Sequence, residues 1–213
     1  MSVLKRIAFF QNRRDEVPNL ELAKDLAERG DRESIGEIVH NLHHENANVR
    51  SDCLKVLYEI GYLRPELIAD YVGEFLALVG DKHNRMVWGG MIALSTIAGI
   101  RAGEIDEHLY EVLEAMQQGS VITRDNGVKV LATVASTHER RRKRILPHLL
   151  RHLKTCRPKD IPGHAEEILR ALSAEKGGKF LMVLDKRMGE LTPSQSARVR
   201  RVMRQAEKIS SSG

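Results

Sequence analysis

The sequence predicts an all-α protein built from stacked helical hairpins, and two periodicities predict it. Aliphatic residues recur at spacings i, i+3, i+4 and i+7, which places four side chains on one stripe of a helix. The same stripe recurs every 37 residues, the size of a helix–turn–helix repeat. The four stripes are Ile35-Ile38-Val39-Leu42, Val72-Phe75-Leu76-Val79, Leu109-Val112-Leu113-Met116 and Leu146-Leu149-Leu150-Leu153.

A second set of stripes predicts the second helix of each hairpin. It keeps step with the first set, with shifts of 37, 37 and 38 residues. The extra residue is explained by the last turn, residues 154–161, which contains Pro158 and is one residue longer than the others. The stripes are Cys53-Val56-Leu57-Ile60-Gly61, Gly90-Ala93-Leu94-Ile97-Ala98, Gly127-Val130-Leu131-Val134-Ala135 and Ala165-Ile168-Leu169-Leu172-Ser173.

Two columns of these second helices contain only small residues. A small side chain in the first column lets the second helix approach its neighbour closely, where a leucine would hold the two apart. The second column lies where the second helix ends, a place suited to a close turn. The columns are Cys53, Gly90, Gly127 and Ala165, and Gly61, Ala98, Ala135 and Ser173.

The chain before the repeats predicts an amino-terminal cap over residues 1–30. We expect helices at 3–11 and 19–29, with Asn19 as the N-cap of the second. This shortened unit closes the core at one end of the stack, as terminal repeats must.

Four repeats are expected over residues 31–178, and a carboxy-terminal cap follows. Prolines Pro65 and Pro147 fit near the first turn of a first helix, where proline costs little, and Pro162 fits the start of the fourth second helix. The glycines at 177–178 are expected to separate the repeats from a carboxy-terminal cap at 179–209. This cap is expected to contain two helices, 179–190 and 193–208. Thr192-Pro193 is expected to begin the final helix, and 210–213 is a frayed tail.

The segment Asn46-Ala47-Asn48-Val49-Arg50, followed by the Cys53 stripe, resembles the second-helix pattern of HEAT-like and armadillo-like repeats. The resemblance extends over about residues 31–178, although the Val-Arg pair becomes Met86-Val87, Thr123-Arg124 and Ile161-Pro162 in the later repeats. It implies a right-handed α-α superhelix whose second helices line the concave side. It implies no single activity, because the family consists mostly of scaffolds.

Composition agrees with a helical surface over an aliphatic core, with 30% charged and 4% aromatic residues. Cys53 falls in a packing column and Cys156 in a turn, so no disulfide framework is predicted. No stretch approaches the run of about 18 apolar residues that a membrane-spanning helix needs. We expect a single domain over residues 1–213 and a cytoplasmic location.

Charge is divided unevenly along the chain. Residues 1–139 contain 15 Lys and Arg and 22 Asp and Glu, whereas residues 140–213 contain 19 and 7. The net charge is therefore −7 over the first stretch and +12 over the second. This polarity is the strongest functional indication in the sequence.

Two basic clusters lie in the second stretch. One opens the first helix of the fourth repeat, where positive charge opposes the helix dipole, and the other lies on the final helix. They make sequence-independent nucleic-acid binding the alternative function, without base readout because aromatic residues are nearly absent there. The residues are Arg140, Arg141, Arg142, Lys143, Arg144, Arg198, Arg200, Arg201 and Arg204.

The second-helix columns beside the small residues are mostly polar and contain Trp88, the only tryptophan. We expect Trp88 to be partly exposed in the concave groove and to act as a binding hot spot. The other interpretation, that Trp88 packs under the next repeat with its N–H satisfied, stays open. The predicted groove residues are Trp88, Arg124, Asp125, Asn126 and Lys129.

Two histidine pairs have helical i, i+4 spacing, His40/His44 and His148/His152. Four ligands are usual for a metal, and no cysteine or carboxylate pattern completes either pair, so no metal site is predicted. No Ser/His/Asp set or Gly-rich phosphate loop stands at a usable spacing, so no catalytic residue and no cofactor is predicted.

The sequence therefore predicts a non-catalytic, monomeric scaffold that binds a protein or peptide in its concave groove, with no membrane partner. Nucleic-acid binding through the basic half is the alternative. A HEAT-like DNA glycosylase is a distant third, because such enzymes use an aromatic-lined groove with a catalytic Asp and only Trp88 and Asp125 resemble one here.

Overall fold

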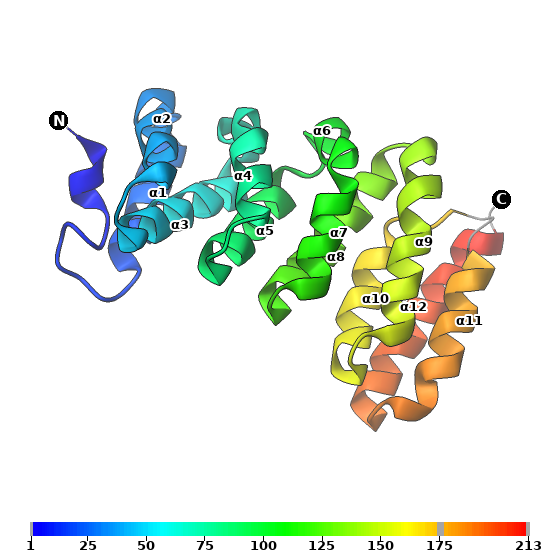
Figure 1. Cartoon of the computed structure of the whole chain (residues 1–213). Helices are drawn as coiled ribbons and strands as arrows, with labels where there is room; N and C mark the ends of the chain where they lie inside the picture. The colour runs from blue at the N-terminus through cyan, green and yellow to red at the C-terminus, as the bar shows by residue number, and fades with distance from the viewer. Residues whose placement is uncertain (1, 174–176, 212–213) are drawn as a thin grey trace. The chain divides into compact units, whose positions relative to one another are not determined.

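The computed structural model describes residues 2–173 and 177–211, and over these residues it is all-α (Figure 1). No strand occurs in this part of the chain. Its α-helices are α1 (Val17–Arg29), α2 (Arg32–His40), α3 (Ala47–Leu63), α4 (Val72–Val79), α5 (Asn84–Ile97), α6 (Ala102–Glu107), α7 (Leu109–Gln118), α8 (Val121–Thr137), α9 (Glu139–Thr155), α10 (Ile161–Leu169), α11 (Gly177–Arg187) and α12 (Pro193–Ser211). Short 3-10 turns are η1 (Val3–Arg6), η2 (Asn41–His43), η3 (Pro65–Leu67), η4 (Ala69–Tyr71), η5 (Pro158–Asp160) and η7 (Met188–Glu190).

Contacts between residues divide the chain into two compact units, residues 1–127 and 128–213. We call them the amino-terminal and the carboxy-terminal unit. The boundary falls within α8 and nearly coincides with the change in charge. The amino-terminal unit contains 14 Lys and Arg against 21 Asp and Glu, and the carboxy-terminal unit 20 against 8. The net charges are therefore −7 and +12.

The predicted apolar stripes form the cores of the repeats. Val72, Leu109 and Leu146, the leading residues of three first-helix stripes, are 9%, 0% and 2% exposed. In the amino-terminal unit the second helices pack side by side in the order α1, α3, α5, and α2 and α4 each pack on one of them. Apolar burial along both stripes accounts for this two-layered arrangement.

The small column has the predicted effect on helix spacing. A Cβ added to Gly90 on α5 would lie 2.8 Å from the Cβ of Leu78 and 3.2 Å from the carbonyl oxygen of Phe75, both on α4. A Cβ on Gly127 would lie 2.2 Å from the Cγ of Met116 on α7. Glycine therefore permits the close approach of the paired helices at these positions, and a larger residue would make a neighbouring group shift.

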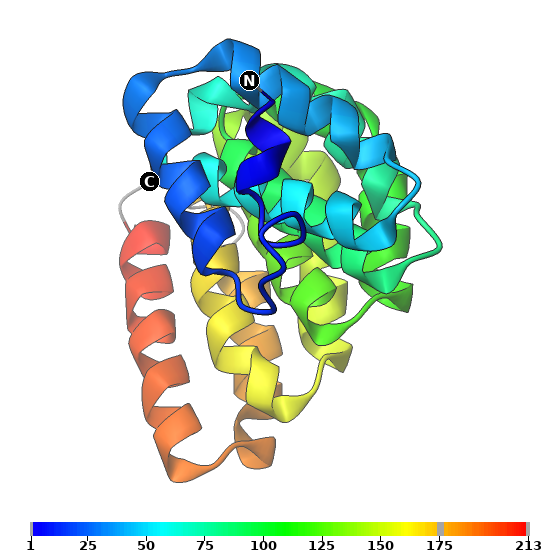
Figure 2. The same cartoon turned by 90° about the vertical axis from the view of Figure 1, so that its left-hand side faces the viewer.

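The amino-terminal cap differs from the predicted helix pair. Only η1 forms within residues 3–11, and α1 begins at Val17 rather than Asn19. Asn19 is not an N-cap, because its side chain is buried and accepts a hydrogen bond from the Ala8 amide at 2.9 Å, while its amide donates to Asp52 at 2.9 Å. These bonds hold the amino-terminal segment against the first hairpin. Figure 2 shows this segment, in dark blue, in front of the neighbouring helices.

Short helical segments precede two of the first helices, and the pattern of apolar stripes did not predict these segments. They are η3 and η4 before α4, and α6 before α7. Their apolar residues, such as Ile68 and Ile105, are fully buried. Each repeat in this region therefore contributes a third, shorter helical piece to the core.

The carboxy-terminal unit holds α9 to α12, and α12 packs against both α10 and α11. Pro147 lies inside α9 rather than in its first turn, because α9 begins at Glu139. The two glycines at 177–178 do not lie between helices, as predicted, but form the first two residues of α11. Thr192 caps α12 as predicted, its hydroxyl accepting from the Gln195 amide at 3.4 Å. Of the predicted tail, residues 212 and 213 lie outside the described residues.

None of the helices described is long and apolar enough to cross a membrane.

Candidate functional site

Trp88 belongs to a row of aromatic side chains on the second helices of the amino-terminal unit. Its half-buried ring packs against Tyr58 of the preceding repeat, with ring centroids 6.4 Å apart and planes tilted by 55°. Tyr58 in turn contacts Tyr62 edge to face at 6.3 Å, and Tyr62 is 52% exposed. We call Tyr58, Tyr62 and Trp88 the aromatic face.

Charged side chains flank the aromatic face. The Lys55 ammonium lies 5.0 Å from the centre of the Tyr58 ring and donates hydrogen bonds at 2.9 Å to Glu16 and Glu59. Burial opposes the charge on Lys55, but these carboxylates outweigh it, and its pKa lies above its usual value. Glu16 also lies 3.8 Å from the Arg85 guanidinium, so two carboxylates and two cations flank the aromatic rings.

Spacing in the sequence contained the signal for the two tyrosines. They lie one helical turn apart on α3, at i and i+4, so their side chains share one face of the helix. They were not predicted because neither belongs to an apolar stripe or to a column of small residues, which are the patterns that the alignment of repeats selected.

The other predicted groove residues lie on α8. Arg124 is half-buried, Asp125 is exposed, and the Asn126 amide donates to the Ile122 carbonyl at 2.9 Å within its own helix. Lys129 follows on the same helix but belongs to the carboxy-terminal unit. The structure thus places Trp88 in a row with two tyrosines. That Trp88 and the α8 residues line one groove stays a prediction.

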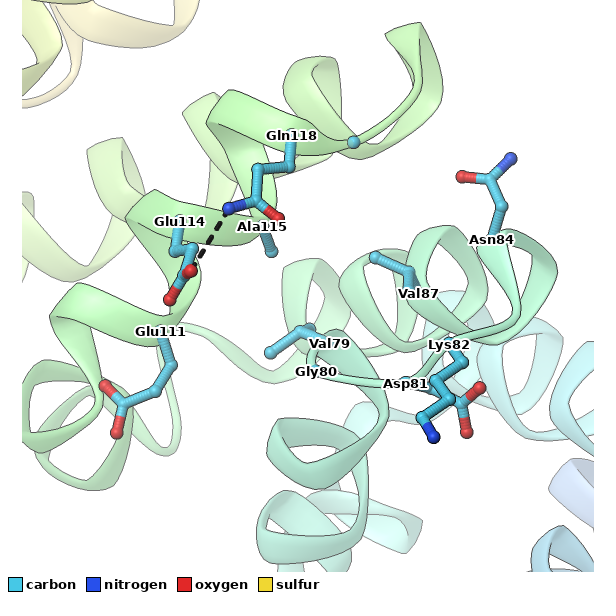
Figure 3. Close-up of a pocket in the computed structure, with 11 residues that line it drawn as sticks. Val79, Gly80, Asp81, Lys82, Asn84, Val87, Glu111, Glu114, Ala115 and Gln118 are labelled. Carbon is cyan, nitrogen blue, oxygen red and sulfur yellow. Dashed lines mark hydrogen bonds between the residues drawn. The ribbon is translucent and has the colours of Figure 1, made fainter.

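An acidic cleft of about 390 Å³ lies in the same unit, between the turn after α4 and helix α7 (Figure 3). Its floor is formed by apolar side chains that include Val79 and Val87. Carboxylates of Asp81, Glu111 and Glu114 line it, accompanied by Lys82 and Gln118. Hydrogen bonds from its own backbone and from His108 hold the pKa of Glu111 below its usual value, so this carboxylate is ionised at neutral pH.

The first basic cluster is partly neutralised by pairing. Glu139, the first residue of α9, accepts from Arg142 and lies 3.7 Å from Lys143. The Arg142 Nε also donates to the Ala171 carbonyl at 3.0 Å, and Arg141 donates to the Thr137 hydroxyl at 2.9 Å. Arg140 and Arg144 are exposed. Fewer than five of the positive charges in the predicted run are therefore both exposed to solvent and outside the pairing described above.

The second basic cluster is divided in a similar way. Arg198 makes a two-pronged ion pair with Glu166 on α10, at 2.5 Å for each bond, which holds the pKa of that carboxyl below its usual value. Arg200, Arg201 and Arg204 are exposed on α12.

A third basic feature was not predicted, a cleft of about 590 Å³ between α9 and α11. Leu150, Val183 and Met182 provide an apolar lining, and Met182 is 60% exposed. The cations Lys154, Lys179, Lys186 and Arg187 surround it.

Repeated hairpins of this size, with a two-layer core and glycine at the helix contacts, define the class of protein. The chain has the α-helical repeat fold of the HEAT/armadillo type. Solved structures agree. A designed armadillo repeat protein in complex with the peptide (KR)4 matches with a TM-score of 0.71 and 16% identity, over 89% of this chain and 86% of that one.

Two further structures show the same likeness. An engineered protein matches with a TM-score of 0.64 and 16% identity over 98% of both chains. Kap121p matches with a TM-score of 0.67 and 12% identity, over 97% of this chain and 23% of that one. At such identities the likeness establishes the fold. A scan against protein-family models and a search of curated proteins give no match.

Proposed function

We propose that the protein is a non-catalytic repeat scaffold whose amino-terminal unit binds an extended segment of a partner protein. The observation that carries the proposal is the aromatic face. Tyrosine and tryptophan provide large, rigid contact areas with a polar tip, and they are enriched in binding hot spots. Here three such rings follow one another across two adjacent second helices, and two of them reach the surface.

Charge favours a basic segment as the partner. The unit has a net charge of −7, and Glu16 and Glu59 lie beside the aromatic face. The acidic cleft offers carboxylates over an apolar floor, a setting that accepts a lysine or arginine side chain with its aliphatic stem. A basic peptide also occupies the designed armadillo repeat protein of similar fold. Complementary charge raises the association rate and specificity more than it raises affinity.

The only tryptophan makes a direct assay available, because its fluorescence reports on the aromatic face itself. We expect the peptide (KR)4 to change the emission of Trp88 and an acidic peptide of equal length to leave it unchanged. With fluorescein-labelled (KR)4 and anisotropy detection, Trp88→Ala and Tyr62→Ala should each weaken binding about tenfold or more, the effect of losing a hot spot.

Tyr110 provides the matched control, since it is a 65% exposed tyrosine on α7 of the same unit. Tyr110→Ala should leave the affinity for (KR)4 unchanged. Equal losses for Tyr62→Ala and Tyr110→Ala, or no saturable binding of (KR)4 at low salt, would remove the proposal.

A second candidate function, sequence-independent nucleic-acid binding, is favoured by the net charge of +12 on the carboxy-terminal unit. Exposed Arg200, Arg201 and Arg204 are the proposed phosphate contacts. Affinity for duplex and single-stranded oligonucleotides should then fall steeply with salt, and the triple Arg→Gln variant should lower the slope of log K against log[salt] by about 2–3.

Exposed cations of the acidic unit serve as the control for this second candidate. The triple change of Lys5, Arg14 and Lys24 to Gln removes the same charge from the other unit. Equal effects of the two triple variants indicate a contribution of net charge alone and count against the nucleic-acid surface, as does a lack of binding at low salt.

A further inference from the structure

Three side chains that bind metals converge between α9 and α10 of the carboxy-terminal unit. The Nε2 of His152 lies 3.1 Å from the Nδ1 of His164, and the two rings are 4.9 Å apart. Cys156 follows the last residue of α9, one turn after His152. The thiol and one nitrogen of each ring all lie within 4.8 Å of one another. The sequence prediction considered His148/His152 and did not pair His152 with Cys156.

The separations are close to those of a tetrahedral zinc site. With Zn–N bonds of about 2.0–2.1 Å and a Zn–S bond of about 2.3 Å, two ligand nitrogens lie about 3.3 Å apart and nitrogen and sulfur about 3.6 Å apart. The two imidazoles already have this spacing. The thiol needs an inward shift of at most about 1.2 Å, which a rotation about its Cα–Cβ bond can supply.

The two histidine rings contact each other in a mostly buried position, where a polar side chain needs a hydrogen-bond partner. His164 is 4% exposed, and its ring nitrogen faces another ring nitrogen, so one of the two must carry the shared proton. A metal ion in the same place accepts a lone pair from both nitrogens. Each ring then keeps its proton on the nitrogen that faces away, and the thiol releases its proton to solvent as the Zn–S bond forms.

The backbone that carries Cys156 is fixed by a buried arginine. The Arg187 guanidinium, from α11, donates to the carbonyls of Leu153 and Cys156 at 2.8 Å each. Glu190 binds the same guanidinium with two bonds of 2.5 and 2.7 Å. Such bonds behind the ligands hold a metal site in shape before the ion arrives.

Charge around the thiol is nearly balanced. The Arg187 guanidinium provides positive charge beside it, and Asp160 provides negative charge. Asp160 is itself paired with Arg157 at 2.6 and 3.0 Å. A divalent cation bonded to the sulfur adds the positive charge that stabilises a thiolate in this nearly neutral setting.

We propose that His152, Cys156 and His164 form a Zn²⁺ site with three protein ligands and one open coordination position. Imidazole suits Zn, Cu, Fe and Ni, and thiolate suits Zn and Cu(I). Zinc is the ion we propose from this shared set, because the separations of the ligand atoms are close to those of a tetrahedral zinc site. Half-buried Cys156 and His152 leave the site accessible from one side, which is where the fourth position opens.

Cobalt provides the test, because Co²⁺ occupies zinc sites and reports its ligands in its absorption spectrum. The full chain, stripped with a chelator and reduced, should bind one Co²⁺ with a visible band of tetrahedral intensity and a near-ultraviolet band from the thiolate. Added Zn²⁺ should displace the bound Co²⁺ and so abolish both absorption bands. Cys156→Ser should abolish the thiolate band, and His164→Asn and His152→Gln should each weaken binding at least about tenfold.

His148→Gln is the matched control, since His148 lies one turn before His152 on the same helix. It should bind Co²⁺ as the unchanged protein does. Circular dichroism confirms the fold of each variant, and Cys156→Ser alters a single atom. Absence of both cobalt bands in the unchanged protein, or equal affinity of the Cys156→Ser and His148→Gln variants, overturns the site and leaves a buried histidine pair.

Thiol alkylation provides an independent measurement. Cys53 is fully buried and Cys156 is half-buried, so Cys156 is the cysteine more accessible to an alkylating reagent in the folded chain. Zn²⁺ should slow alkylation of Cys156 at least about tenfold, and the His164→Asn variant should lose this protection. Equal rates with and without Zn²⁺ overturn the proposal.

Discussion

Replacing Gly90 by alanine tests whether the small column sets the distance between paired helices. A new Cβ would meet the Cβ of Leu78 at 2.8 Å, about 1 Å closer than an ordinary carbon–carbon contact. It would also meet the Phe75 carbonyl at 3.2 Å. Neither group can move away without shifting the backbone of α4. Overpacking of this kind costs about 1–3 kcal/mol, whereas alanine in a helix gains about 0.5–1 kcal/mol over glycine.

We therefore expect Gly90→Ala to destabilise the amino-terminal unit by up to about 2.5 kcal/mol, the difference of these two effects. Gly36 is the matched control, since it lies inside α2 and its added Cβ meets only the Tyr71 hydroxyl, at 3.5 Å. Gly36→Ala should stabilise the unit. Urea unfolding followed by Trp88 fluorescence measures both. A Gly90→Ala variant as stable as Gly36→Ala would refute the reasoning.

Three further predictions concern single hydrogen-bonding groups. Asn19→Leu should cost the amino-terminal unit about 1–3 kcal/mol in urea unfolding, because the Ala8 amide loses its buried acceptor, and an unchanged midpoint would contradict this. Arg187→Met should cost the carboxy-terminal unit about 2–4 kcal/mol by circular dichroism, because two carbonyls lose their donor and Glu190 its partner, and a loss below about 0.5 kcal/mol would contradict it. Hydrogen bonds from Ser34 hold the pKa of Asp31, the N-cap of α2, below its usual value. The ionised Asp31 therefore stabilises the folded chain above the unfolded pKa of about 4, and this stabilisation is lost as the pH falls through the folded pKa. The advantage of the unchanged protein over Asp31→Ala in urea unfolding should therefore be about 1 kcal/mol at pH 7 and shrink by about pH 3, and a constant difference would contradict the assignment.

Repetition allowed the fold to be predicted in detail. A residue such as Val72 or Leu109 is selected by two periods at once, that of the helix and that of the repeat, so its burial follows from the sequence. The amino-terminal cap was predicted less well because it repeats nothing. Asn19 has the chemistry of an N-cap, and only its contacts with Ala8 and Asp52 reveal that it fastens the preceding segment instead.

The candidate sites were less predictable than the fold. The basic clusters were visible as charge, but their pairing was not, since Glu166 lies 32 residues from Arg198 and opposes it only across the contact of α10 with α12. The aromatic face depends on Tyr58 of one repeat meeting Trp88 of the next.

By itself the sequence determined which side chains are buried, where glycine is needed and how charge is divided between the two units, because these properties depend on spacing along a regular helix and on composition. Tertiary structure alone decided which polar side chains meet. His152 and Cys156 share a helical turn in the sequence, but their contact with His164 depends on the angle at which α10 returns along α9. That angle is set by core packing and by the turn between the helices, and neither of these leaves a period in the sequence.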